Sequence, residues 1–335
     1  MKKFVAMLLC LMMVVALCAC GESGSLDDAL NNSAKEDVID GSAGLAMGTG
    51  GDSGTYYAVG GVICKVVGDK TGLDLTAVAT GGSADNLQNM GLVYQLATVQ
   101  SDVMTYAYNG TNTFAESGKL DNFRVLCALY AETVQIVTLD PSIKSVADLK
   151  GKSVCVGDQG SGTYYNTVDV LAAYGMTIDD IKPVYQSFAD STESLQDGKI
   201  DAAFLCAGAP TPAVSTLDSA KPIYLVSIDD EHMAKLLDAC PYYASYTIPA
   251  GTYESFKEDT QTVTVKATLI CSANLSDDCA YKLVSAIFEN KDAITELHAK
   301  GAELDLTFAT DGIAVPFHAG AAQYFAEQGI TVATK

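Results

Sequence analysis

Short apolar runs rich in β-branched residues alternate with amphipathic stretches along most of the chain. In its first part, the pattern predicts strands at residues 44–50, 73–82, 94–102 and 124–130. It predicts helices between them at residues 55–69, 83–92 and 101–110. Alternation of this kind is typical of largely parallel sheets with helices on both faces. The first part is therefore predicted to be an α/β unit.

The same alternation starts again near Lys152. Strands are predicted at residues 152–158, 182–188, 200–208 and 221–229, with helices at 163–175 and 230–241. A further strand is predicted at 263–275, and two helical segments follow it. Two α/β units followed by a leftover strand and helices indicate a chain that passes twice between two lobes.

We therefore predict an α/β, two-lobed fold with a hinge and a central cleft. Lobe I is predicted to contain residues 44–130 plus 247–335, and lobe II residues 131–246. The alternative is one large doubly wound sheet, which the restart of the pattern near Lys152 disfavours.

The first twenty residues have the pattern of an export signal. Lys2 and Lys3 precede an apolar segment at 4–16, and Leu17-Cys18-Ala19-Cys20 resembles a bacterial lipobox. We expect residues 1–19 to be a lipoprotein signal peptide, Cys20 to be lipidated, and the polar stretch 20–43 to be a disordered tether. This predicts an exported protein, lipid-anchored on the outer face of the cytoplasmic membrane. An ordinary cleaved signal with a chance cysteine is the alternative.

Charge and cysteine content exclude several classes of protein. The net charge is −21, so the surface repels nucleic acid, and an anionic ligand must be held by local donors. Removing Cys10, Cys18 and Cys20 leaves an odd number of cysteines, several of them in apolar runs, which argues against a disulfide framework. No Cys-x-x-Cys motif or Cys/His cluster indicates a metal site, and no cofactor is expected.

One pentapeptide, Ser-Gly-Thr-Tyr-Tyr, occurs at both 53–57 and 161–165. Each copy follows a predicted strand and opens a predicted helix, at the edge of the sheet where α/β proteins bind ligands. Helix N-termini offer unpaired N–H groups, and the dipole there stabilises a carboxylate by roughly 0.3–2 kcal/mol. If the copies face each other across the cleft, they form an anion clamp. The alternative is two well-capped helix starts.

Two catalytic or cofactor interpretations of the first copy fail. Gly-Asp-Ser-Gly resembles the nucleophile segment of chymotrypsin-like proteases, but that chemistry needs a histidine base, and His232, His298 and His318 all lie far downstream. The segment 48–54 also lacks the third glycine of a dinucleotide fingerprint. We therefore do not expect an enzyme.

Seven segments together carry a family resemblance: "GTGGDSGTYYAVGG", "TGGSADNLQNM", "VQSDVMTYAYNG", "GSGTYYNTVDVL", "GKIDAAFLCAGAPTPAV", "IPAGTY" and "GIAVPFHAGAAQYF". Between Ala46 and Gly329 the chain resembles the TAXI family of solute receptors, which belong to tripartite ATP-independent periplasmic (TRAP) transporters. The resemblance implies a type II solute-binding fold and a membrane permease driven by an ion gradient. It also implies a small carboxylate ligand, such as glutamate, a glutamine-like amino acid or 2-oxoglutarate.

The resemblance also implies a set of ligand-binding residues. In lobe I these are Gly50, Gly51, Asp52, Ser53, Gly54, Thr55, Tyr56, Ser83, Asn86, Gln100 and Ser101. In lobe II they are Ser161, Gly162, Thr163, Ser187 and Gly208. The amides of Asn86 and Gln100 would orient the ligand, and Tyr56 would form a wall of the pocket. Tyr57 and Tyr165 are expected to pack in the core.

Two departures from the family pattern bear on the ligand. Arg124 is the only arginine and lies away from every motif, although related dicarboxylate receptors use an arginine for the carboxylate. Asp52 stands where many relatives have a small neutral residue, and it would pair with an α-ammonium group, which favours an amino acid. Alternatively, Asp52 faces solvent and caps the helix.

The function predicted from the sequence is delivery of a small carboxylate to a TRAP permease by a monomeric receptor. A ligand-sensing or adhesin-like surface lipoprotein with the same cleft and no transporter is the rival function. The sequence alone does not discriminate between the two.

Overall fold

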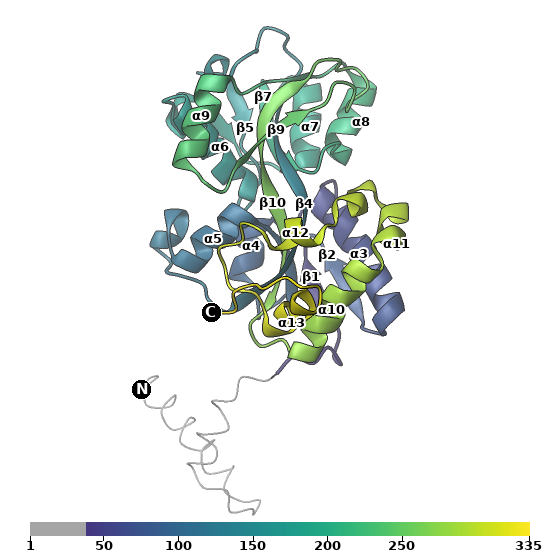
Figure 1. The fold of residues 1–335 in the computed structure, drawn as a ribbon. Helices are drawn as coiled ribbons and strands as arrows, with labels where there is room; N and C mark the ends of the chain where they lie inside the picture. The colour runs from purple at the N-terminus through teal and green to yellow at the C-terminus, as the bar shows by residue number, and fades with distance from the viewer. Residues whose placement is uncertain (1–37) are drawn as a thin grey trace, which may run out of the picture. The chain divides into compact units, whose positions relative to one another are not determined.

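The computed structural model describes residues 38–335 of the 335-residue chain. The predicted signal peptide, Cys20 and most of the predicted tether lie outside the described residues. Residues 39–335 form one compact unit, shown in Figure 1. Within that unit no helix is both long and apolar enough to cross a bilayer.

Ten strands of the described residues join one sheet. They are β1 (Leu45–Gly48), β2 (Leu75–Val78), β3 (Leu96–Gln100), β4 (Phe123–Thr138), β5 (Ser153–Cys155), β6 (Lys182–Val184), β7 (Ala202–Ala207), β8 (Tyr224–Leu225), β9 (Ala244–Ile248) and β10 (Thr260–Ser272).

Helices lie between and after these strands. The α-helices are α3 (Thr55–Thr71), α4 (Ser83–Gln88), α5 (Ser101–Asn109), α6 (Gly162–Ala173), α7 (Phe188–Gln196), α8 (Pro212–Ala220), α9 (Asp230–Ala239), α10 (Asp277–Glu289), α11 (Lys291–Leu297), α12 (Leu306–Thr310) and α13 (Ala319–Glu327). The 3₁₀ helices are η1 (Asn112–Ala115), η2 (Val146–Leu149), η3 (Ile178–Asp180) and η4 (Ala299–Glu303).

The strand order is β2-β1-β3-β10-β4-β7-β5-β6, with β8 added beside β4 and β9 beside β10. Strands β1, β2 and β3 are parallel to one another, as are β5, β6 and β7. The two central strands, β4 and β10, are antiparallel to each other and to their outer neighbours β7 and β3. Each parallel group therefore belongs to its own α/β unit, and the two units meet at β4 and β10.

Strands β4 and β10 pass through both lobes, as Figure 1 shows. The first half of β4, including Phe123 and Leu129, packs in the core of lobe I, whereas Val134 and Ile136 pack in a core of lobe II. Strand β10 runs the opposite way, with Val265 in lobe II and Leu269 in lobe I. The sheet is continuous because these two strands are long, and the hydrophobic cores on its two halves are separate.

One predicted boundary between the lobes, the return of the chain to lobe I, differs in the structure. Lobe I was expected to resume at residue 247, but Ile248 and Tyr253 pack in a lobe II core, as do Val263 and Val265. The reason is that β9 pairs antiparallel with the first part of β10 before the chain crosses. We therefore place the second crossing near Lys266, where β10 faces Ala131 of β4.

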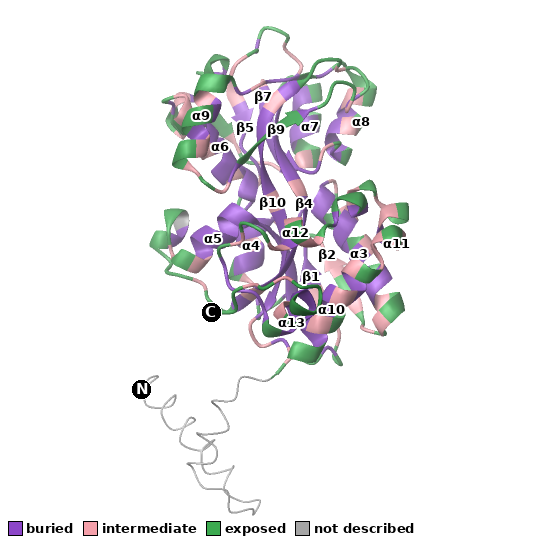
Figure 2. Cartoon of the chain, in the orientation of Figure 1, coloured by how far each residue is buried: buried purple, intermediate pink, exposed green. Residues whose placement is uncertain are grey.

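Figure 2 shows the burial that follows from this arrangement, with the central strands covered by helices on both sides. The described cysteines are free thiols, and all except the partly buried Cys240 are buried. They pack as small hydrophobic residues, as the apolar runs around them indicate.

Two later helices pack closely through a glycine, which generates a first prediction. A Cβ added at Gly320 in α13 would lie 2.1 Å from the backbone oxygen of Asp277 in α10. The obstructing atom belongs to the backbone of α10, which cannot shift aside as the flexible end of a side chain could. We therefore expect Gly320→Ala to lower the free energy of unfolding by about 1–3 kcal/mol. Denaturant unfolding of the mature protein measures this.

The matched control is Gly61→Ala on α3, where an added Cβ meets nothing within 4 Å. Alanine is the better helix former, so this variant should gain roughly 0.5–1 kcal/mol. Equal effects of the two substitutions would contradict the close packing of α10 and α13.

Candidate ligand-binding site

A cavity of about 60 Å³ lies between the two lobes and is lined from both sides. Predicted site residues from lobe I that line it are Gly50, Gly51, Gly54, Thr55, Tyr56, Ser83 and Gln100. Those from lobe II are Ser161, Gly162, Thr163 and Ser187. The structure therefore brings both copies of the repeated pentapeptide to the same cavity.

Both copies open helices whose first turns are not capped by side chains. Helix α3 begins after Gly54 and α6 after Ser161, and neither N-terminal cap has a side-chain hydrogen bond. The Ser161 hydroxyl is buried without a hydrogen-bond partner. The alternative of two well-capped helix starts does not describe these turns. Instead, each leaves N–H groups available at the cavity.

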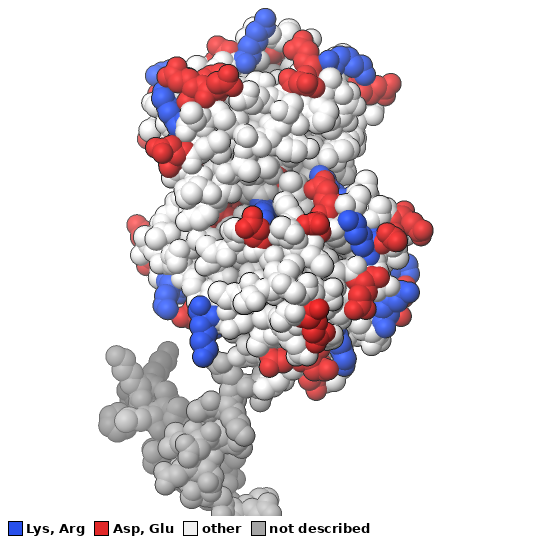
Figure 3. All heavy atoms as spheres, viewed as in Figure 1, with Lys and Arg blue, Asp and Glu red and all other residues white. Residues whose placement is uncertain are grey.

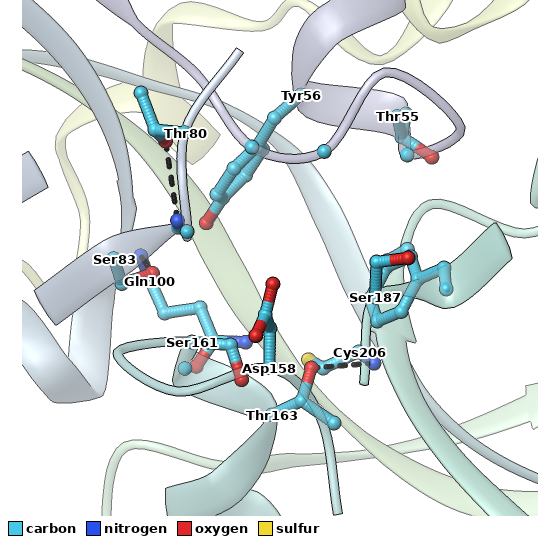
Figure 4. Close-up of a pocket in the computed structure, with 18 of the residues that line it drawn as sticks. Thr55, Tyr56, Thr80, Ser83, Gln100, Asp158, Ser161, Thr163, Ser187 and Cys206 are labelled. Atoms are coloured by element: carbon cyan, nitrogen blue, oxygen red, sulfur yellow. Dashed lines mark hydrogen bonds between the residues drawn. The ribbon is translucent and has the colours of Figure 1, made fainter. Parts of the chain in front are cut away.

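Hydroxyl groups around the cavity are oriented by backbone donors, as Figure 4 shows. The Ser83 hydroxyl oxygen accepts a hydrogen bond from the Gln100 N–H at 3.0 Å. That of Thr163 accepts one from the Cys206 N–H at 3.3 Å, and that of Thr80 accepts one from the Gly82 N–H at 3.1 Å. The Thr80 hydroxyl also donates to the Thr49 carbonyl oxygen at 3.0 Å, so both of its hydrogen-bonding roles are filled within lobe I. The hydroxyl groups of Ser83 and Thr163 accept these bonds and can each donate their own hydrogen to a ligand.

Five predicted site residues do not line the cavity. Asp52 is exposed and Ser53 lies away from the cavity, so the aspartate faces solvent in this structure. The Asn86 amide donates to the carbonyl oxygens of Thr49 and Thr98 and thereby ties two strand ends together.

The other two predicted site residues off the cavity, Ser101 and Gly208, form hydrogen bonds within the protein. The Ser101 hydroxyl accepts from the Lys266 N–H, and the Gly208 carbonyl accepts from the Thr55 hydroxyl across the lobes. Both residues follow strand ends, as the sequence pattern requires, but their polar groups are used inside the protein.

The cavity also has lining residues that the sequence analysis missed: Thr80, Gly81, Gly82, Glu132, Asp158, Phe188, Cys206 and Ala207. The sequence positions of two of these residues could have identified them as candidates. Glu132 is the only charged residue in the apolar run 125–137, and Asp158 lies between the end of β5 and the second pentapeptide, three residues before Ser161. Arg124, by contrast, is not among the residues that line the cavity.

Glu132 is only 2% exposed although it carries a carboxyl group. Its Oε2 accepts a hydrogen bond of 2.5 Å from the Tyr56 hydroxyl. Burial raises the pKa of Glu132 well above its ordinary value, and this outweighs the hydrogen bond from Tyr56 and the more distant charge of Lys300.

A polar network joins the lobes behind the cavity. The Gln100 side-chain amide donates to Asn166 Oδ1 at 3.0 Å, and Asn166 in turn donates to Asp102 Oδ2 at 3.1 Å. Asn166 also donates to the Tyr243 hydroxyl, which donates to Asp169. Since Gln100 and Asp102 belong to lobe I and the others to lobe II, this network holds the lobes in a closed arrangement.

Comparison with known proteins identifies the family. The model of the NMT1-like family matches residues 47–329, which is most of the chain. The chain belongs to the NMT1-like family.

Solved structures resemble this NMT1-like protein at low sequence identity. A protein from Bordetella bronchiseptica RB50 has a TM-score of 0.53 at 18% identity, covering 85% of this chain and 89% of its own. The alkanesulfonate-binding protein SsuA from Xanthomonas axonopodis pv. citri, bound to MOPS, has a TM-score of 0.48 at 15% identity, covering 85% and 91%. The GluR0 ligand-binding core from Nostoc punctiforme, in complex with L-glutamate, has a TM-score of 0.48 at 13% identity, covering 78% and 100%.

The fold itself is that of type II periplasmic binding proteins, as the sequence predicts. Two α/β lobes are joined by two long strands, and a cavity lies where they meet. The alternative of one doubly wound sheet is wrong, because the two halves of the sheet have separate cores and its central strands are antiparallel to each other.

Glycine makes the closed arrangement of this NMT1-like protein possible. A Cβ on Gly162 of lobe II would lie 2.1 Å from Gln100 Oε1 of lobe I. Gln100 is buried, and Asn166 holds its amide, so it cannot swing away without breaking the network. We predict that Gly162→Ala keeps the lobes apart and weakens ligand binding at least 10-fold, with little loss of stability in the ligand-free protein.

Small-angle X-ray scattering with and without a stabilising ligand measures closure. The wild-type protein should contract on binding and Gly162→Ala should not. The double variant Gln100→Ala/Gly162→Ala removes the obstacle and should contract again, with Gln100→Ala as the matched control. Contraction of the single Gly162→Ala variant would exclude this contact as a limit on closure.

The buried Asp102 carboxyl group in the network is expected to make the stability of the fold depend on pH. Its side chain is 0% exposed, and burial raises the pKa of Asp102 to about 7. The folded protein therefore binds more protons than the unfolded chain between about pH 4 and 7, and stability from this group falls as pH rises through that range. We expect Asp102→Asn to abolish this loss, so its stability relative to wild type should increase by up to roughly 4 kcal/mol from pH 4 to 7.

Denaturant unfolding at several pH values measures the difference. Asp69→Asn, at an exposed helical position, is the control and should show no such trend. A constant difference between Asp102→Asn and wild type across this range would mean that the carboxyl does not titrate there.

Proposed function

We propose that this protein is an extracytoplasmic solute-binding receptor of the TAXI type, which delivers a small carboxylate to an ion-gradient-driven TRAP permease. The observation that carries the proposal is the convergence of two uncapped helix N-termini, from opposite lobes, on one cavity. Such termini hold an anion through backbone N–H groups and the helix dipole. A carboxylate ligand would therefore bridge the lobes and favour the closed form.

The surface supports local capture of the ligand. On the face shown in Figure 3, lysine and arginine side chains are scattered among acidic ones and form no positive patch. An anion would gain its binding energy inside the cleft, from the N–H groups that open α3 and α6 and from the hydroxyl groups of Ser83 and Thr163.

Binding rather than catalysis suits the surroundings of Ser53. The histidines of the described residues all have other partners: His318 contacts the Leu275 carbonyl, His232 contacts Asp229, and His298 accepts from the Lys300 N–H. In residues 38–335 none of them lines the cavity. A serine without an oriented histidine base lacks the arrangement that hydrolysis requires.

Membrane attachment through Cys20 and the TRAP partner belong to the same proposal. Export followed by lipidation would hold a monomeric receptor on the outer face of the cytoplasmic membrane, where a permease is accessible. The rival function is a sensor or adhesin-like lipoprotein that uses the same cleft. Reconstitution with a candidate permease separates them, because a transport receptor must be required for uptake.

A thermal-shift screen of the mature protein tests the ligand class. We expect stabilisation by at least one of glutamate, glutamine and 2-oxoglutarate, amounting to about 2.7 kcal/mol at a ligand concentration 100 times the dissociation constant. Glucose, adenosine and AMP serve as controls and should give no shift. Stabilisation by these controls alone would contradict the carboxylate assignment.

A further inference from the structure

The charged side chains that line the cavity are both acidic. Among the described residues, Glu132 contributes one carboxyl from β4 and Asp158 contributes another from the loop before α6, and no lysine, arginine or histidine lines the cavity. None of the ion pairs formed within residues 38–335 includes Glu132 or Asp158. The cavity therefore holds two carboxyl groups without a protein counter-ion.

The nearest lysine is occupied elsewhere. Lys300 Nζ lies 2.5 Å from Glu303 Oε1 and 5.8 Å from the centre of the Tyr130 ring. Its charge acts on Glu132 only at a distance, without an ion pair. Glu132 receives a hydrogen bond from Tyr56, which orients the carboxyl but supplies no positive charge.

Asp158 approaches the ligand space from lobe II. It lies beside Ser161, which opens α6, and Figure 4 shows both in the group of side chains that faces Tyr56 and Thr55. Asp158 is half-buried, and one of its oxygens accepts from the Gln159 N–H. Asp158 of lobe II and Glu132 of β4, just past the crossing at Ala131, therefore line the same small cavity.

A purely anionic ligand would lie beside the Asp158 carboxyl with no positive charge between them, which is costly away from water. It would also offer no partner to Glu132, whose pKa is raised by burial so that its neutral form is favoured until a cation lies beside it. A ligand with both a carboxylate and a protonated amine removes this conflict, since the carboxylate can bind at a helix N-terminus while the amine meets the acids. We propose that Glu132 and Asp158 form an ammonium subsite and that the ligand is a zwitterionic α-amino acid.

This inference rests on the proposed function and narrows it to one ligand class. It moves the ammonium partner from Asp52, which is exposed and off the cavity, to two residues on its walls. The two sites also differ in origin, because Asp52 precedes α3 of lobe I whereas Asp158 precedes α6 of lobe II.

Isothermal calorimetry on matched ligand pairs tests the subsite. The probes are L-glutamate with 2-oxoglutarate and L-alanine with pyruvate, plus L-glutamine, each titrated into the mature wild-type protein and three variants. We expect an amino acid to bind at least 10-fold more tightly than its 2-oxo analogue. Asp158→Asn should weaken the amino acid by about 10- to 100-fold, the range for a hydrogen bond to a charged group.

Glu132→Gln keeps an acceptor for the Tyr56 hydroxyl and should also weaken binding of the amino acid. Asp52→Asn is the matched control and should leave the affinity for each ligand unchanged. If Glu132→Gln does not fold, the half-buried Asp158 still decides the matter. Equal or tighter binding of the 2-oxo acid to wild type, or an unchanged preference in Asp158→Asn, would overturn the subsite and leave a carboxylate receptor. Failure of every acid in the panel to bind would overturn the proposed function and the subsite together.

Discussion

The structure depends on two strands that each pack in the hydrophobic cores of both lobes. Strands β4 and β10 pair with each other over residues 123–133 and 264–272, and each leaves one lobe and enters the other near Ala131 and Lys266. Because the chain crosses between the lobes in these two strands, relative motion of the lobes must bend them. The same crossing places Glu132 beside the cavity, so the hinge and the binding site are built from one segment.

Closure depends on small residues as much as on polar ones. Gly162 permits Gln100 to approach α6, and Gly208 lets Thr55 and Lys300 pack against the end of β7. The Gly160 carbonyl accepts hydrogen bonds from the Ala84 and Asp85 N–H groups of the opposite lobe. The polar network behind the cavity can form because these glycines allow close contacts that a larger side chain would prevent.

Hydrophobic periodicity predicted most elements, because the inner strands of the parallel groups, such as β3 and β7, are buried runs between amphipathic helices. It did not predict the length of β4, since Glu132 and Thr133 interrupt its apolar run, and it missed β9, which is mostly exposed. The repeated pentapeptide located the cavity. Choosing between Asp52 and Asp158 was beyond the sequence, because the direction of each depends on loop conformation, including positive φ angles at Gly157 and Gly160.

The free thiols lie in two kinds of place, one exposed by lobe opening and the other only by unfolding. Cys127 and Cys271 are buried in the core of lobe I, whereas Cys206 lines the cavity between the lobes. Burial raises the pKa of all three thiols, so each reacts slowly unless it becomes exposed. A thiol reagent reaches Cys206 at a rate set by lobe opening, and it reaches the other two at a rate set by unfolding. Labelling followed separately at Cys206 and at Cys271 therefore distinguishes opening of the cleft from global unfolding.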